Sequence, residues 1–286
     1  MTERLVPVDG AELCVDTFGD PTDPAVLLVS GAAASMDLWD AEFCVLLAAE
    51  GRYVIRYDHR DTGRSTTSPV GQPAYSAEDL TTDPVRVLDA LGVDRAHLVG
   101  LSAGGGIAQE VAALHPHRLH TLTLVATSAA GDRADQTSLP PMEPRVAVTF
   151  QDPAPQPDWD DRAAAVDYLV EIERPYAGRL GYDEERARRK AERVVDRTRD
   201  LAASVTNHWV LAGEAIPFRL ADISVPTLVM HGTADPMFPL PHGEALATEI
   251  PGASLVRLEG MGHEMPPPPL WDLVITTLER HTATNT

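Results

Sequence analysis

The chain is poor in features that would point to several classes of protein. It has two cysteines, Cys14 and Cys44, both inside apolar stretches. Two such cysteines offer no disulfide framework and are predicted to be reduced core residues. No apolar run approaches the ~20 residues that a bilayer-spanning helix requires, and the N-terminus lacks the apolar core of a signal peptide. These absences predict a soluble, cytoplasmic protein.

Positive charge is also scarce. The 286 residues include 23 Lys and Arg against 43 Asp and Glu, a formal net charge of −20. Because nucleic acids and anionic membranes are bound by basic surfaces, neither is expected as a partner. The charge favours a neutral or cationic small molecule over a polyanion. No His, Cys and Asp residues have metal-ligand spacing, so we expect no metal and no other cofactor.

What the sequence does contain is a regular alternation of strand and helix patterns, typical of an α/β fold with a mostly parallel central sheet and helices on both faces. Residues 4–8 and 11–18 predict a hairpin around Asp9-Gly10. Further strands are predicted at 25–30, 53–57, 96–99, 119–126, 225–230 and 254–258. Helices are predicted at 36–50, 76–91, 107–115, 241–250 and 270–280.

The alternation stops in the middle of the chain. Prolines crowd residues 140–157, and residues 182–200 are dense in Glu and Arg, which is typical of a solvated helix with i,i+4 ion pairs. Strand patterns resume at Val225. The sequence therefore predicts a core made of residues 1–130 and 223–286, with an inserted helical cap at 131–222.

The strongest chemical signal is a Gly-x-Ser-x-Gly motif at residues 100–104, centred on Ser102. The motif is short enough to occur by chance, but here it follows a predicted strand directly and opens a helix. That is the setting of a nucleophile elbow, in which small neighbours allow a sharp turn and the serine is held in strained geometry. A phosphate-binding turn is the alternative, but the lysine of a P-loop and the dinucleotide spacing are missing. Ser102 is the predicted nucleophile.

A serine hydroxyl needs a base, and His263 is the histidine placed to act as one. It lies in a glycine-flanked loop directly after the strand at 254–258. Asp235, after the strand that ends at 230, is the acid expected to orient the imidazole and stabilise its protonated form. The acid can instead follow the preceding strand, which is predicted at 119–126, but no carboxylate occurs there until Asp132. Asp235 is therefore preferred. The chain order Ser, Asp, His differs from the orders of chymotrypsin and subtilisin.

Acyl transfer also needs donors for the developing oxyanion, each worth ~3 kcal/mol when correctly aimed. We expect one to be the backbone N–H of Ala103, at the start of the helix after the nucleophile. The other is assigned to the backbone N–H of Ala32, in the small-residue turn after the strand at 25–30.

Taken together, these segments resemble the α/β-hydrolase superfamily. The features that carry the resemblance are Ser30-Gly31 and the segments 58–65, 100–104, 231–235 and 262–263. Within the superfamily the chain looks most similar to the aclacinomycin methylesterase group of streptomycete polyketide-tailoring enzymes, above all at residues 18–21 and 56–65. The resemblance covers about residues 1–130 and 223–282, implies the α/β-hydrolase fold and a Ser-His-Asp triad, and fades in the cap.

Two positions depart from the pattern of these relatives. Ser30 stands where many of them have histidine, and Ala103 stands where the methylesterase group tends to have methionine. The missing methionine argues against a perhydrolase or haloperoxidase-like activity. Asp58 and Arg64 are expected to hold the loop beneath the site through ion pairs and hydrogen bonds rather than to act in catalysis.

The cap is expected to roof a mostly apolar pocket. The predicted substrate contacts are Trp209, Tyr176, Met142 and His208, with Tyr168 and Phe218 as further candidates. An apolar side chain in a helical cap more often packs than binds a ligand.

The resulting hypothesis is a cofactor-free serine esterase that cleaves a carboxylic ester of a small, largely apolar molecule through an acyl-enzyme. The resemblance implies a polyketide methyl ester as one such substrate. The same triad serves a lactone hydrolase, a thioesterase or a carbon–carbon bond hydrolase. A catalytically silent binding protein on this fold is the other alternative, and a complete set of Ser102, Asp235 and His263 argues against it.

Overall fold

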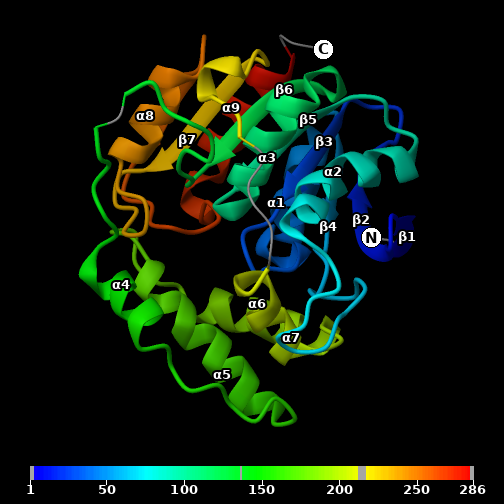
Figure 1. Ribbon diagram of the computed structural model, residues 1–286, viewed down its shortest axis with the longest axis vertical. Helices are drawn as coiled ribbons and strands as arrows, with labels where there is room; N and C mark the ends of the chain where they lie inside the picture. The colour runs from blue at the N-terminus through cyan, green and yellow to red at the C-terminus, as the bar shows by residue number, and fades with distance from the viewer. Residues whose placement is uncertain (1–2, 136, 212–216, 284–286) are drawn as a thin grey trace.

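The computed structural model describes residues 3–135, 137–211 and 217–283, with a single sheet at the centre (Figure 1). The sheet has eight strands in the order β1-β2-β4-β3-β5-β6-β7-β8. The β1–β2 and β2–β4 pairs are antiparallel and the other neighbouring pairs are parallel, which confirms the predicted mostly parallel sheet. The strands are β1 (Arg4–Val8), β2 (Ala11–Phe18), β3 (Ala25–Val29), β4 (Tyr53–Tyr57), β5 (Ala96–Leu101), β6 (Leu119–Val125), β7 (Thr227–Gly232) and β8 (Ser254–Leu258).

Helices cover both faces of the sheet. The face covered by α2 (Ala77–Leu91), α3 (Ala103–Leu114) and α8 (Pro241–Glu249) holds one hydrophobic cluster. The opposite face, covered by α1 (Ala41–Ala49) and α9 (Trp271–Ala283), holds another. The confirmed α/β architecture therefore has two apolar layers, one on each side of the strands.

β3 is a continuous apolar run in the sequence because both of its faces are buried. Every residue of β3 is buried. Successive side chains of a strand point to opposite faces, so Leu27 and Val29 join one cluster while Val26 and Leu28 join the other. A parallel strand between two helical layers needs no polar face, which explains the pattern in the sequence.

Two predicted helices differ from the observed ones at their first turns. The helix expected over 36–50 is divided into the short 3₁₀ helix η1 (Met36–Leu38) and α1. Asp40 accounts for the division, since its side chain accepts the N–H of Glu42 and caps α1. The helix expected over 107–115 begins earlier, at Ala103, because the turn at Ser102 leads directly into α3.

Between β6 and β7, the described residues include four α-helices that lie together at one end of the molecule (Figure 1). We call them the insertion helices: α4 (Pro144–Gln151), α5 (Arg162–Glu173), α6 (Glu184–Arg197) and α7 (Leu201–Thr206). α5 and α6 bury a small cluster of their own around Val166, Val170 and Ala191. None of the helices in the described ranges combines the length and the apolar character of a membrane-spanning segment.

The chain leaves and re-enters the core at one place. The N–H of Asp132 donates to the carbonyl of Phe218 over 2.7 Å, and the N–H of Leu220 donates to the carbonyl of Asp132 over 3.0 Å. This parallel bridge between Asp132 and Arg219 fixes the two ends of the connecting segment side by side. The insertion helices are thereby added to the sheet without separating β6 from β7, which remain hydrogen-bonded neighbours.

Candidate active site

Ser102 occupies a sharp turn between β5 and α3. Its φ and ψ are 55° and −121°. This conformation is strained for a residue with a Cβ, and such strain is concentrated at functional sites. Hydrogen bonds hold the turn, from the Ser102 N–H to the Val125 carbonyl (3.0 Å) and from the Thr127 hydroxyl to the Ser102 carbonyl (2.7 Å). A Cβ at Gly100 would collide with the carbonyl of Gly104. Gly100 is therefore required by the close approach of β5 and α3.

The structure brings Ser102, His263 and Asp235 together in one hydrogen-bonded chain. His263 Nε2 lies 2.9 Å from Ser102 Oγ, and His263 Nδ1 lies 2.9 Å from Asp235 Oδ2. Oδ1 of the same carboxylate accepts the N–H groups of Met237 (2.9 Å) and Phe238 (2.8 Å). Since a carboxylate only accepts, Nδ1 carries the proton and Nε2 presents its lone pair to the serine hydroxyl.

Three parallel strands supply these side chains from their carboxyl ends. Ser102 follows β5, Asp235 follows β7 and His263 follows β8. The His263 N–H donates to the Tyr176 carbonyl over 2.9 Å, so the backbone beside the imidazole is held by η3 (Arg174–Tyr176), which follows α5. In an α/β sheet the carboxyl ends of the strands form the binding edge. The arrangement of the three residues follows from the topology.

The segment after β3 lies against the serine. A Cβ at Gly31 would stand 3.5 Å from the Ser102 Cβ, and one at Gly104 would collide with backbone carbonyls at the end of β3. Ala32 therefore sits in a turn beside the nucleophile. Ala103 is the first residue of α3, and the leading N–H groups of a helix have no partner within it. Both predicted oxyanion donors are thus near Ser102.

Beneath the site, Asp58 is held by backbone and side-chain donors. Its two oxygens accept the N–H groups of Met36 and Arg64, each over 2.9 Å. The ion pair of Asp58 is with Arg197 at the end of α6 (2.9 Å), whereas the Arg64 side chain pairs with Glu3. Burial raises the pKa of the Asp58 carboxyl, and Arg197 acts against that rise. The sequence singled out Asp58 and Arg64 but missed Arg197.

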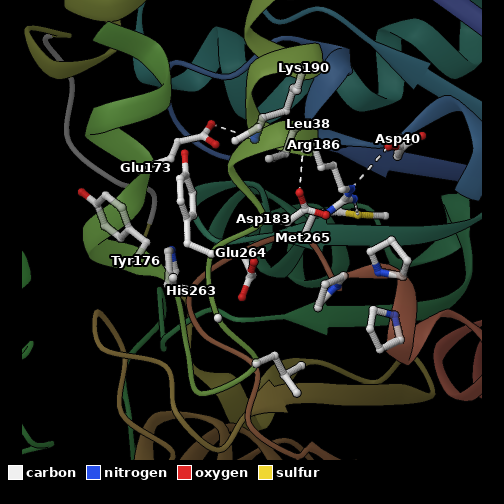
Figure 2. A pocket seen from close by; sticks show the side chains of 18 of the residues that line it. Leu38, Asp40, Glu173, Tyr176, Asp183, Arg186, Lys190, His263, Glu264 and Met265 are labelled. Atoms are coloured by element: carbon white, nitrogen blue, oxygen red, sulfur yellow. Dashed lines mark hydrogen bonds and ion pairs between the residues drawn. The ribbon is translucent and has the colours of Figure 1, made fainter. Parts of the chain in front are cut away.

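A cavity of about 530 Å³ opens on one side of His263. Figure 2 shows Tyr176 and His263 on one side of it, with Arg186 and Asp40 on the other. Glu264 also faces it, and burial raises the pKa of that carboxyl. Ser102 does not line this cavity. Its apolar walls include Leu38, Leu180, Tyr182, Met265 and Pro267.

The four predicted substrate contacts have different surroundings. The Tyr176 ring lies 6.0 Å from the His263 ring and lines the cavity. Trp209 is 57% exposed and packs edge-on against Phe150, away from the cavity lining. Met142 is half-buried just before α4 and does not line the cavity.

The fourth, His208, is bonded to the backbone of the core through both ring nitrogens. Its Nδ1 accepts the N–H of Ala33 (2.9 Å), and its Nε2 donates to the carbonyl of Arg60 (2.9 Å). Of the two further candidates, Phe218 is buried in the main hydrophobic core and Tyr168 packs edge-on against Trp159. Phe218 is therefore a core residue.

Sequence reasoning also missed Phe238. Its ring lies 5.3 Å from the His263 ring in an edge-to-face arrangement, and its N–H donates to Asp235. Its position three residues after the predicted acid was the available signal. Within the described part of the chain, no group of three or more His, Cys, Asp or Glu residues is arranged to hold a metal ion.

Comparison with known proteins identifies the family of the chain. The family model described as the α/β hydrolase fold matches residues 24–266. Rhodomycin D methylesterases from Streptomyces sp. (strain C5) and Streptomyces peucetius are 34% and 31% identical, each alignment covering 93% of both chains. An esterase from Rhodococcus sp. ECU1013 superposes with a TM-score of 0.75 at 20% identity, covering 100% of both chains. The predicted resemblance is confirmed: the chain belongs to the α/β hydrolase fold family.

Proposed function

We propose that this protein is a carboxylic ester hydrolase in which Ser102 is the nucleophile, His263 the general base and Asp235 the orienting acid. The observation that carries the proposal is the chain of two 2.9 Å hydrogen bonds that joins the three side chains. The strained φ of 55° at Ser102 supports it, since such strain is retained where it aims a reacting group. The two methylesterase relatives, aligned over 93% of this chain, favour an ester as the substrate.

In the proposed reaction, Ser102 Oγ attacks the ester carbonyl carbon while His263 Nε2 accepts the hydroxyl proton. The carbonyl oxygen becomes an oxyanion that the N–H groups of Ala32 and Ala103 stabilise. The carbon–oxygen bond to the alcohol then breaks, and His263 returns the proton to the leaving alkoxide. A water molecule, deprotonated by His263, attacks the acyl-enzyme, and Ser102 leaves with the proton as the acid is released.

The substrate we propose is a methyl ester carried by a polycyclic, largely apolar molecule. Two relatives named as rhodomycin D methylesterases support this class. The rings of Tyr176 and Phe238, 6.0 Å and 5.3 Å from the His263 ring, offer aromatic surfaces beside the proposed reaction centre. We propose further that residues 131–222 form the cap over this site, because Tyr176 reaches His263 from that segment.

The first test is intact-mass analysis after exposure to a fluorophosphonate, combined with turnover of p-nitrophenyl acetate. We expect one adduct on the native protein, none on Ser102→Ala, and loss of turnover in that variant. Ser128→Ala is the matched control, because Ser128 is also hydrogen-bonded to a histidine, His242 (2.7 Å). It should label and turn over normally. An adduct that persists on Ser102→Ala, or native protein that neither labels nor hydrolyses the ester, contradicts the proposal.

The substrate class is tested separately. A polycyclic aromatic methyl ester should be turned over with a higher kcat/KM than a macrolactone of similar size. If the macrolactone is the better substrate, lactone hydrolysis replaces ester hydrolysis as the function of the same triad.

A further inference from the structure

We infer that His208 is a positioning residue that holds the turn carrying Ala32 in the shape the oxyanion site requires. This role rests on the function proposed above and deepens it, because it concerns the geometry of one proposed oxyanion donor. His208 belongs to η4 (Asn207–Trp209), directly after α7, and is therefore contributed by the segment between β6 and β7.

The hydrogen bonds of the imidazole define its protonation state. Ala33 N–H can only donate, so Nδ1 presents a lone pair to it over 2.9 Å. The Arg60 carbonyl can only accept, so Nε2 carries the hydrogen over 2.9 Å. A neutral ring with its hydrogen on Nε2 satisfies both partners at once. One side chain thus links the turn after β3 to the loop after β4.

The turn formed by residues 31–34, to which His208 is hydrogen-bonded, has a strained backbone. It is closed by a hydrogen bond from Ala34 N–H to the Gly31 carbonyl (3.3 Å), which makes Ala33 its third residue. Ala33 has a φ of 57°. A positive φ at this position is the signature of a type II turn and favours glycine, because a Cβ crowds the backbone there. The Ala33 N–H belongs to the central peptide of the turn, whose orientation separates type II from type I. His208 therefore bonds to the peptide group that would flip.

The position of the His208 imidazole is fixed by contacts of the ring and of its neighbour in the chain. Its neighbour Asn207 is fully buried, donates to Asp61 Oδ2 (2.7 Å) and accepts the N–H of Gly71 (2.7 Å). The rings of His59 and Tyr75 lie 5.7 Å and 6.4 Å from the His208 ring, both edge-on. The hydrogen-bonding nitrogens of His208 are thus held in place from the side of the β4–α2 loop.

The electrostatic surroundings favour the neutral ring. Burial lowers the pKa of His208, and the hydrogen bond to the Arg60 carbonyl and the charge of Asp61 oppose that change. In the part of the chain that the structure describes, the other titratable rings against His208 are those of His59 and Tyr75. Burial lowers the pKa of His59 to about 3 and raises the pKa of Tyr75. Near neutral pH, Nδ1 therefore stays free to accept the Ala33 N–H.

A positioning role predicts a specific kinetic effect. An oxyanion exists in the transition state and not in the bound ester, so loosening the turn lowers kcat more than it changes KM. For His208→Leu, which fills similar space without hydrogen bonds, we expect kcat for p-nitrophenyl acetate to fall about tenfold to a hundredfold. KM should change by less than about threefold. His208→Gln keeps an acceptor and a donor and should recover most of the loss.

The control and a second variant separate this role from general destabilisation. His97→Leu removes another buried imidazole, one that bonds to Thr121 (3.0 Å) far from the turn, and should leave kcat unchanged. Ala33→Gly, made in the His208→Leu background, should restore part of kcat because glycine accepts the positive φ without strain. Thermal melting establishes that each variant is folded.

Amide hydrogen exchange gives a readout that does not depend on activity. Peptides covering residues 31–34 should exchange faster in His208→Leu than in the native protein, and at the native rate in His97→Leu. Unchanged kcat and unchanged exchange in folded His208→Leu overturn the inference while native turnover leaves the proposed function intact. A loss confined to KM assigns His208 to substrate binding instead and also overturns it. Native protein without turnover contradicts the proposed function, and the exchange experiment still decides whether His208 holds the turn.

Discussion

The two oxygens of Asp235 have separate tasks. Oδ1 is occupied by the N–H groups of Met237 and Phe238, so Oδ2 is fixed on His263 Nδ1. This division keeps the carboxylate from rotating, and through it the imidazole is held in one tautomer. A side chain of the same shape but without a second acceptor tests the importance of that tautomer.

We predict that Asp235→Asn lowers kcat by about 10⁴ while the protein stays folded. The amide oxygen can replace Oδ1 toward Met237 and Phe238, but the amide NH₂ faces Nδ1 and moves the imidazole hydrogen to Nε2. Steady-state hydrolysis of p-nitrophenyl acetate and a melting curve measure the two effects. Asp132→Asn, the other carboxylate considered from the sequence, is the control and should be as active as the native protein. The reverse result would assign the acid to Asp132.

Single-residue predictions depended on how local the signal was. Ser102, Asp235 and His263 each follow a strand within a few residues, so their approach at one sheet edge follows from the alternation of strands and helices. The two hydrogen bonds of His208 reach Ala33, which is 175 positions away in the sequence, and Arg60, which is 148 positions away. Nothing in the local sequence around residue 208 marks such partners, and its surroundings in the fold had to be seen directly.

At the scale of elements, α6 differs most from what its sequence suggests. Its density of Glu and Arg predicted a solvated face, and Arg189 and Glu185 do form an exposed i,i+4 ion pair. Its last residue, Arg197, instead reaches inward to Asp58, whose side chain is fully buried, and to Glu3. Charge density alone gives no indication of which arginine of a helix turns toward the core.

We predict that Arg197→Leu lowers the free energy of unfolding by about 3–5 kcal/mol, because it leaves Asp58 buried without its cation. Urea denaturation at neutral pH measures the change. Arg193→Leu, on the same helix, is the matched control: Arg193 is exposed and lies 3.7 Å from Asp37, so its loss should cost at most about 1 kcal/mol. Equal effects of the two substitutions would show that Asp58 does not depend on this ion pair.

Strand and helix existence was predictable along the core, while several boundaries were not. The division of η1 from α1 follows from an Asp40 side chain that caps the second helix. The early start of α3 follows from the elbow geometry at Ser102. Both depend on hydrogen bonds and dihedral angles of single residues, which hydrophobic periodicity does not report.

At the scale of the whole molecule, buried histidines make stability depend on pH. Burial lowers the pKa of His97 and of His59, each from 6.5 to about 3. At pH values between about 3 and 6.5, these two histidines are protonated in the unfolded chain and neutral in the folded chain. The free energy of unfolding therefore falls as the pH falls from about 6.5 toward 3.

We predict that His97→Leu has a shallower dependence than the native protein. Removing one such histidine should reduce the slope by up to about 1.4 kcal/mol per pH unit between pH 6 and pH 4. Urea unfolding at several pH values measures both slopes, and the change in repulsion from the net charge of −20 is common to the two proteins. Parallel curves would mean that His97 is protonated in the folded state.

The hydrogen-bonded bridge between Asp132 and Arg219 holds the two ends of the intervening segment side by side, so that this segment is an insertion between β6 and β7. Such a segment can lengthen, shorten or change without shifting the strands. In this protein, however, the same segment contributes the Tyr176 carbonyl that binds the N–H of His263 and the His208 imidazole that binds the N–H of Ala33. On the function proposed above, a change in this segment that displaces either contact is expected to move His263 or the Ala33 turn, and so to change kcat.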